Sequence, residues 1–294
     1  MVRASGTSKR ERLNAVAADR KRIAVVAPSS RLGDGVAEQV TALAASLGGD
    51  AVPEVWFHPQ CFLSDGHFAG SDAARAAAFV EVANDPSVDA VWLARGGYGS
   101  GRLIEAVLPR LTDVARAKAY LGYSDGAALL GALYADGFAG CAHGPMAQDV
   151  MRPGGAAAVR RALAWLTGRA AGALEPSLEP GRKAAAFNMA ILSSLIGTPW
   201  LPDLSDHVLM LEEVSEHMYR IDRFLFHITS APPIRRVAGI RLGRCSAIPS
   251  NDPDFGRAEE DIAREWCARA GLAYLGRADI GHDAENKVVP FGAP

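Results

Sequence analysis

The chain has 294 residues, of which 49% are hydrophobic and 22% are charged, so it can form one large domain or two ordinary domains with packed cores. This composition excludes a disordered or fibrous protein. The 31 Lys and Arg residues nearly balance the 33 Asp and Glu residues, and the net charge of −2 leaves no positive excess for binding nucleic acid or an anionic membrane.

Two segments and the four cysteines bear on where in the cell the protein is found. Residues 1–22 mix Arg, Lys, Glu and Ser and lack the apolar run of about 7–15 residues that a secretory signal needs, so we interpret them as a polar arm. Residues 184–202 carry no charge, but polar residues, glycine and prolines interrupt them, which favours a buried helix followed by a turn over a membrane span. The four cysteines are widely spaced and form no C-x-x-C pair, which favours a reducing cytoplasm.

From residue 21 onward, short β-rich runs alternate with alanine-rich helical stretches, a pattern typical of a mostly parallel sheet flanked by helices. Strands are expected at 23–27, 51–57, 90–93 and 119–121, and helices at 35–47, 127–134 and up to about residue 168. Ser71 and Asp72 are expected to cap a further helix. Together these elements predict an N-terminal α/β domain over residues 23–168.

Glycine and proline accumulate after the last of these helices, and we place a linker at 169–181 and a C-terminal domain at 182–294. Helices are expected near 189–196, 219–228 and 257–270, and strands near 207–211 and 237–242. The prediction for this half is a smaller α+β unit.

The sharpest local signal is the sequence GYSDG at 122–126, between a predicted strand and a predicted helix. A serine on a tight strand-to-helix turn projects its hydroxyl outward, and the N–H that follows lies at a positive helix end that can hold an oxyanion. The pattern predicts Ser124 as a nucleophile. The alternative is that Ser124 only caps the helix.

A second signal is the sequence RGGYGSG at 95–101, directly after another predicted strand. Its four glycines allow main-chain N–H groups to approach a ligand closely, which suits a phosphate or a developing negative charge on oxygen. Arg102 stands where G-x-G-x-x-G requires its last glycine, so the spacing does not favour a dinucleotide. A purely structural turn is the other alternative.

A serine nucleophile needs a general base, and the chain offers seven histidines. His282 lies at a transition from an apolar run to a loop and is the candidate base. His143 also follows an apolar run and is its main rival, whereas His207 and His227 are interpreted as scaffold residues.

A carboxylate is expected to orient the base, and the apolar run at 208–211 ends in Glu212 and Glu213. Adjacent strand residues face opposite sides, so at most one of the two can point into a cleft, and two solvated acids remain the alternative. The chain contains neither H-E-x-x-H nor S-x-x-K, so neither zinc-peptidase nor penicillin-binding chemistry is predicted, and no metal or cofactor is expected.

Taken together in order and spacing, these segments resemble the LD-carboxypeptidases, a serine peptidase family that also includes the microcin C self-immunity peptidases. The segments that carry the resemblance are IAVVAPSS (23–30), FAGSDAAR (68–75), ARGGYGSGRL (94–103), GYSD (122–125), HGPM (143–146), IGTP (196–199), LEEVSEHMYRIDR (211–223) and GH (281–282). The chain departs from the family at 185–189, where AAFNM replaces the typical Gly-Gly-Asn-Leu, and at Gly126, where the family commonly has a larger residue.

The resemblance implies a two-domain enzyme, usually a homodimer, with the nucleophile in the first domain and the acid and base in the second. The matching positions are Ser124 as nucleophile, Glu212 as orienting acid, His282 as general base, the N–H groups of Gly97 and Asp125 as oxyanion hole, and Tyr98 and Asn188 as substrate-binding residues.

The implied activity is release of terminal D-alanine from murein tetrapeptide in the cytoplasm, during peptidoglycan recycling, without a cofactor. Three alternatives stay open at this point. They are a microcin-immunity-type peptidase that cleaves aminoacyl or peptidyl sulfamoyl-adenylates, a general α/β-hydrolase esterase, and a non-catalytic protein that binds a small ligand.

Overall fold

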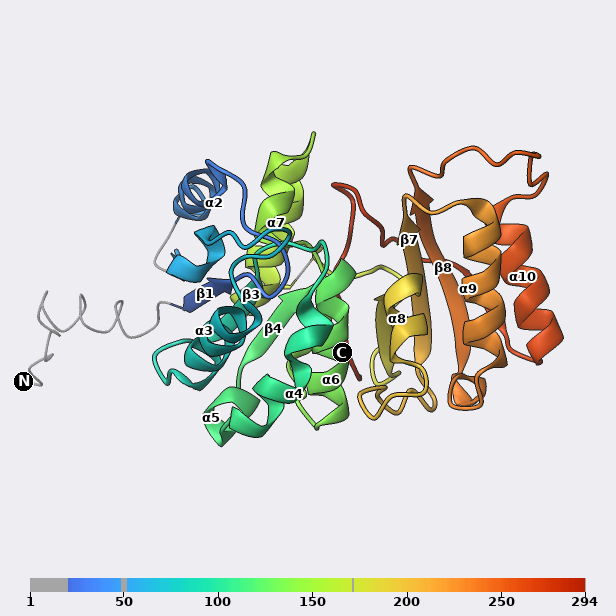
Figure 1. The fold of residues 1–294 in the computed structure, drawn as a ribbon, viewed down its shortest axis with the longest axis horizontal. Coiled ribbons are helices and arrows are strands. Elements are labelled where there is room, and N and C mark those ends of the chain that lie inside the picture. The colour runs from blue at the N-terminus through green and yellow to red at the C-terminus, as the bar shows by residue number, and fades with distance from the viewer. Residues whose placement is uncertain (1–20, 49–51, 171, 294) are drawn as a thin grey trace, which may run out of the picture.

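The computed structural model describes residues 21–48, 52–170 and 172–293. The predicted polar arm at 1–22 lies almost entirely outside the described residues. The described chain forms two sheets with helices packed against them, one built mainly from the N-terminal half and one from the C-terminal half (Figure 1). This arrangement confirms the predicted α/β class with a second, smaller unit. None of the helices in the described ranges combines the length and apolarity that crossing a bilayer requires.

The first sheet has six strands in the order β10-β5-β4-β3-β1-β2. These strands are β1 (Arg22–Val26), β2 (Glu54–Phe57), β3 (Ala90–Leu93), β4 (Ala119–Gly122), β5 (Cys141–His143) and β10 (Val289–Pro290). All neighbours are parallel except β10, which pairs antiparallel with β5. The loops after the parallel strands therefore gather at one edge of the sheet, where ligands bind in open α/β folds.

Helices cover both faces of the first sheet. On one face lie α2 (Val36–Ala45) and α7 (Gly155–Leu166), and on the other lie α3 (Asp72–Asn84), α4 (Ile104–Val107), α5 (Asp113–Arg116) and α6 (Ala127–Ala135) (Figure 1). The predicted cap of α3 is confirmed, since the Ser71 hydroxyl accepts a hydrogen bond of 3.2 Å from the Ala74 N–H.

The second sheet has the order β6-β7-β8-β9, and its strands are all parallel. Its elements are β6 (Ala184–Asn188), α8 (Met189–Leu195), β7 (Val208–Val214), α9 (Met218–Ser230), β8 (Gly239–Ser246), α10 (Glu259–Ala270) and β9 (Tyr274–Arg277). A helix between each pair of consecutive strands returns the chain to the same end of the sheet, so the strands run parallel. This unit is therefore α/β in its detail, a correction of the predicted α+β arrangement.

Strand β6 was not predicted, because its sequence AAAFN is buried on both faces and shows no alternation. The helix expected near 189–196 is confirmed as α8, which begins at Met189.

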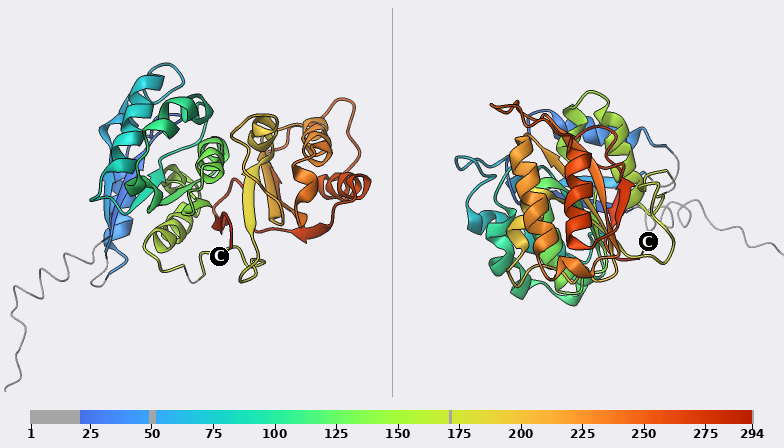
Figure 2. Two further views of the ribbon diagram at one scale, coloured as in Figure 1. Left: turned by 90° about the horizontal axis from the view of Figure 1, so that it is seen from below. Right: turned by 90° about the vertical axis from the view of Figure 1, so that its right-hand side faces the viewer.

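The last residues of the chain join the two sheets. The Phe291 N–H donates to the Cys141 carbonyl at 2.8 Å in the first sheet, while Ala184 and Gly292 exchange two hydrogen bonds of 2.9 Å in the second. The Phe291 ring is buried, and its centroid lies 5.1 Å from that of Phe187. Figure 2 shows this C-terminal segment, in red, between the sheets. The end of the range predicted as a C-terminal domain thus belongs spatially to both units.

We expect Phe291→Ala to lower the free energy of unfolding by about 3–5 kcal/mol, because it removes a buried aromatic ring at the junction of the sheets. The control is Phe62→Ala, whose ring is 44% exposed and whose loss should cost less than about 1 kcal/mol. Urea unfolding followed by circular dichroism measures both values, and equal losses in the two variants would contradict the structural role of Phe291.

Candidate active site

Ser124 stands where strand β4 gives way to α6, as the first residue of a short 3-10 turn over Ser124–Gly126. Its φ of 58° is unusual for a residue with a side chain and marks a sharp turn that the surrounding structure holds. The hydroxyl does not cap the turn. It lies 3.0 Å from Nε2 of His282, so the alternative of a simple N-cap is wrong.

Small residues around Ser124 allow this turn to pack closely. A Cβ on Gly96 would lie 2.9 Å from the Ser124 hydroxyl, so the glycine loop passes directly beside it. A Cβ on Gly122 or on Gly126 would lie 2.6 Å from Cδ1 of Leu93. At Gly126, where the family resemblance leads us to expect a larger residue, Leu93 occupies the adjacent space.

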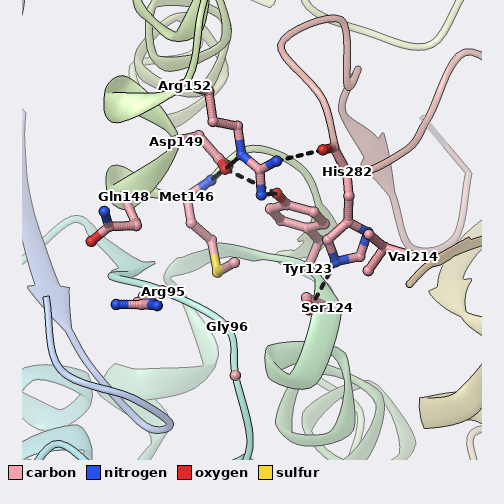
Figure 3. Close-up of a pocket in the computed structure, with 11 residues that line it drawn as sticks. Arg95, Gly96, Tyr123, Ser124, Met146, Gln148, Asp149, Arg152, Val214 and His282 are labelled. Carbon is pink, nitrogen blue, oxygen red and sulfur yellow. Dashed lines mark hydrogen bonds and ion pairs between the residues drawn. The ribbon is translucent and has the colours of Figure 1, made fainter. Parts of the chain in front are cut away.

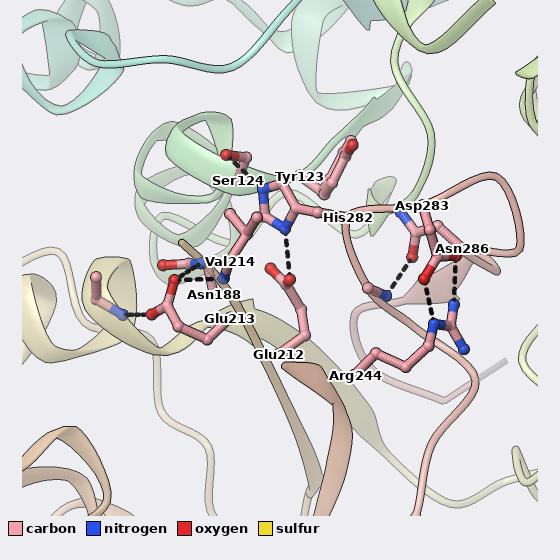
Figure 4. A network of polar contacts seen from close by, with 12 residues as sticks. Tyr123, Ser124, Asn188, Glu212, Glu213, Val214, Arg244, His282, Asp283 and Asn286 are labelled. Atoms are coloured by element: carbon pink, nitrogen blue, oxygen red, sulfur yellow. Dashed lines mark hydrogen bonds and ion pairs between the residues drawn. The ribbon is translucent and has the colours of Figure 1, made fainter. Parts of the chain in front are cut away.

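His282 connects the two units of the fold. Its Nε2 faces Ser124, and its Nδ1 lies 2.6 Å from Oε2 of Glu212 on strand β7 (Figure 4). Glu212 is fully buried, and its other oxygen has no hydrogen-bond partner within the described residues. The structure therefore brings together three side chains that are far apart in the sequence, in the order hydroxyl, imidazole, carboxylate.

Glu212 and burial act in opposite directions on the protonation of His282. Burial alone would lower the pKa of the imidazole, but the carboxylate of Glu212 beside Nδ1 more than offsets this effect and raises the pKa above its usual 6.5. The carboxylate thus favours the imidazolium that forms when His282 accepts a proton.

Glu213 faces away from His282, as expected for adjacent strand residues. Its carboxylate accepts hydrogen bonds from Asn188 Nδ2 at 2.7 Å and from the Ala190 N–H at 3.0 Å. Burial raises the pKa of Glu213 to about 7. Asn188, expected to bind substrate, is itself buried and caps α8 through the Ile191 N–H. Its side chain supports strand β7 rather than lining the cavity described below.

His143, the rival base, lies behind the site. It is fully buried, its Nε2 lies 3.1 Å from Oδ1 of Asn286, and burial lowers its pKa to about 4. The same Asn286 oxygen accepts the N–H of Gly281, next to His282. His143 therefore faces the loop that carries His282 and not the Ser124 hydroxyl.

Gly97 and Asp125, the residues expected to supply oxyanion N–H groups, are held in place by a small polar network. The buried Asp125 carboxylate accepts from the Ser29 hydroxyl at 2.5 Å and from the Ser100 N–H at 2.8 Å, so it ties the glycine loop to the Ser124 turn. Gly97 has φ 116°, and a Cβ there would lie 2.3 Å from the Ser30 hydroxyl, so only glycine fits.

A cavity of about 400 Å³ opens beside Ser124 and His282 (Figure 3). The other residues that line it are Arg95, Gly96, Gly97, Tyr123, Met146, Gln148, Asp149, Arg152 and Val214. Tyr98, expected to bind substrate, is not among them. It is exposed, and its ring packs against that of Phe68.

Sequence reasoning missed a second polar network that holds the His282 loop from the first unit. The Asp149 carboxylate accepts from the Tyr123 hydroxyl at 2.9 Å and from Arg152 Nε at 2.8 Å. Arg152 also donates to the carbonyl of His282 at 2.5 Å. The spacing of Asp149 and Arg152, three residues apart just after the HGPM segment, is the signal that could have indicated this pair.

The described residues contain no cluster of three or more His, Cys, Asp or Glu side chains that could hold a metal ion.

Comparisons with known proteins identify the family. Residues 23–144 match the LD-carboxypeptidase N-terminal domain, and residues 184–294 match the LD-carboxypeptidase C-terminal domain. A putative carboxypeptidase of Streptomyces coelicolor is 31% identical over 93% of this chain and 89% of its own length. The chain therefore belongs to the LD-carboxypeptidase family of peptidases, which confirms the resemblance seen in its sequence.

Two further relatives carry more specific names. The murein tetrapeptide carboxypeptidase of Pseudomonas aeruginosa is 26% identical over 92% of this chain and 91% of its own length. The crystal structure of muramoyltetrapeptide carboxypeptidase from Oxalobacter formigenes has a TM-score of 0.75 at 26% identity, covering 92% of this chain and 93% of that one. A microcin C7 self-immunity protein in complex with aspartyl sulfamoyl adenosine shares the fold, with a TM-score of 0.75 at 18% identity over 92% of this chain and 91% of that one.

The opposing effects on His282 give a testable result. Glu212→Gln removes the charge that favours the imidazolium while burial remains, so the pKa of His282 should fall from above 6.5 to below it. Glu213→Gln is the matched control, since this more distant carboxylate raises the pKa less and its loss should cause a smaller shift in the same direction. NMR titration of the histidine ring signals measures both, and an unchanged pKa in Glu212→Gln would contradict the assigned contact.

Proposed function

We propose that this chain is a serine LD-carboxypeptidase that releases terminal D-alanine from murein tetrapeptide. The observation that carries the proposal is the chain of contacts from Ser124 Oγ to His282 Nε2, 3.0 Å, and from His282 Nδ1 to Glu212, 2.6 Å, beside an open cavity. This is the arrangement in which an imidazole activates a hydroxyl and a carboxylate holds the imidazole in the required tautomer.

In the proposed reaction, Ser124 Oγ attacks the carbonyl carbon of the scissile amide, and His282 Nε2 accepts the hydroxyl proton. Glu212 stabilises the resulting imidazolium. The N–H groups of Gly97 and Asp125 stabilise the negative charge on the former carbonyl oxygen. Neither N–H donates to an acceptor within the described residues, so both can serve a ligand.

Collapse of this intermediate breaks the amide bond. His282 gives its proton to the leaving amine of D-alanine, and an acyl ester on Ser124 remains. Water then attacks the ester, with His282 as the base once more, and returns the hydroxyl to Ser124. No group outside the chain, the peptide and water takes part in either half of the reaction.

The substrate proposal rests on family membership and on the murein tetrapeptide activity named for the relatives from Pseudomonas aeruginosa and Oxalobacter formigenes. We further propose a cytoplasmic enzyme of peptidoglycan recycling that acts as a homodimer. The location is supported by the four cysteines, all of them unpaired. The dimer is supported by the family resemblance alone.

The test is mass spectrometry of the products after incubation with murein tripeptide, tetrapeptide and pentapeptide. We expect loss of one D-alanine from the tetrapeptide only. Ser124→Ala should reduce the rate by about 10³-fold or more, because no other group can form the acyl ester, while circular dichroism remains unchanged.

The matched control is Ser194→Ala, an exposed serine on α8, which should retain full activity. Normal turnover by Ser124→Ala would refute the mechanism. Cleavage of an aminoacyl sulfamoyl adenosine in place of the tetrapeptide would reassign the substrate, and broad hydrolysis of nitrophenyl esters without peptide cleavage would indicate an esterase.

A further inference from the structure

Arg95 differs from the other charged side chains that line the cavity. Arg152 is paired with Asp149, and His282 is paired with Glu212. Arg95 has no carboxylate partner within the described residues. Within the part of the chain that the structure describes, its guanidinium makes one hydrogen bond, a long one of 3.4 Å to the carbonyl of Arg31. The cavity therefore contains one cation whose charge no acid compensates.

The acid in the cavity, Asp149, is paired with Arg152 and makes no ion pair with Arg95. Asp149 accepts from the Met146 N–H at 2.8 Å in addition to the Tyr123 hydroxyl and Arg152 Nε. Each of the three guanidinium nitrogens of Arg152 already makes one contact, with Asp149, with the His282 carbonyl and with the Tyr123 hydroxyl. An anionic ligand that enters the cavity therefore meets in Arg95 a cation that, unlike Arg152, is paired with no acid among the described residues.

Gln148 supplies a second donor beside Arg95. Its N–H bonds the carbonyl of Ala94 at 2.9 Å, which places its backbone next to that of Arg95. Its Oε1 accepts a hydrogen bond of 2.8 Å from the Gly33 N–H. Because only the oxygen of a side-chain amide can accept from an N–H, this bond fixes the orientation of the amide. The Nε2 group has no acceptor within the described residues. In Figure 3 the labelled side chains of Arg95 and Gln148 lie on one side of the cavity, and Ser124 and His282 lie on the other.

We propose that Arg95 and Gln148 bind the terminal carboxylate of the substrate and thereby restrict cleavage to the last residue of a peptide. A guanidinium and an amide N–H₂ together match the two oxygens of a carboxylate. In a peptide bound with its scissile carbonyl at Ser124, only three bonds separate that carbonyl carbon from the terminal carboxylate carbon, so both ends fit one small cavity. This inference rests on the proposed peptidase function and adds the group that makes the enzyme a carboxypeptidase.

The experiment compares a tetrapeptide that ends in D-alanine with the same peptide that ends in D-alaninamide. For the wild type we expect kcat/KM to be about 10- to 100-fold higher for the free acid, the range that one charged hydrogen-bond pair supplies. Arg95→Gln should lose most of this preference, mainly through a higher KM for the acid. Arg95→Lys should keep part of it, since the charge remains without the planar donors.

Gln148→Leu should reduce the same preference by a smaller factor, and Arg160→Gln serves as the matched control. Arg160 is an exposed arginine on α7 outside the cavity, so its loss should leave both substrates unaffected. Equal cleavage of acid and amide by the wild type, or an unaltered preference in Arg95→Gln, would overturn the assignment while the hydrolase mechanism stands.

Cleavage of neither peptide by the wild type would instead refute the proposed function. In that case, binding measurements test the role of Arg95 in carboxylate recognition independently of catalysis. Calorimetry on Ser124→Ala, with and without Arg95→Gln, should show the free acid bound more tightly than the amide only where Arg95 is present. Equal affinities in the presence of Arg95 would contradict the proposal.

Discussion

The hydrogen bond between His282 and Ser124 depends on the contact between the two halves of the fold. Ser124 belongs to the first sheet, whereas Glu212 belongs to the second, and His282 lies on a loop between them. The loop is held from the first unit by Arg152 at the His282 carbonyl and by Arg161 at the carbonyl of Asn286. The C-terminal segment that pairs with both sheets then fixes the distance between them. The geometry of the candidate site and the contact between the two halves of the fold therefore depend on each other.

The burial of Glu212 adds an electrostatic requirement to this geometry. A fully buried carboxylate is costly unless it is paired, and the imidazole is its hydrogen-bond partner here. A Cβ at Gly243 on the neighbouring strand would lie 2.9 Å from Cβ of Glu212, so a glycine is needed there for the strands to pair. In the proposed mechanism, attraction between the Glu212 carboxylate and the imidazolium of His282 offsets the free-energy cost of burying this charge.

Much of the fold could be predicted from local pattern. The strands β1, β3 and β4 and the helix α6 begin and end within one or two residues of their predicted bounds, because apolar runs and alanine-rich stretches were bounded by turn residues. Strands β5 and β10 were missed because two or three residues carry no periodicity. The strand direction in the second sheet was also missed, since direction depends on how the chain returns between strands and not on any single segment.

The candidate site likewise contains residues that could be predicted from the sequence and residues that could not. The turn at Ser124 and the glycine loop have local signatures, and the structure places both where the sequence indicated. The choice of His282 over His143, and of Glu212 over Glu213, needed the family resemblance, because the local sequence left both pairs open. Asp149 and Arg152 form a local pair, but their contacts with Tyr123 and with the His282 loop arise only on folding, as does the position of Arg95 beside Gln148. Asn188 is the opposite case, because this motif residue caps α8 and supports the site from outside the cavity.

The most direct test of the account is labelling with a fluorophosphonate, which reacts with a serine only when a base activates it. Mass mapping of the modified protein should place one label on Ser124, and His282→Ala should abolish it although Ser124 is intact. Equal labelling of wild type and His282→Ala, or a label on another serine, would contradict the claim that the two halves of the fold meet to activate Ser124.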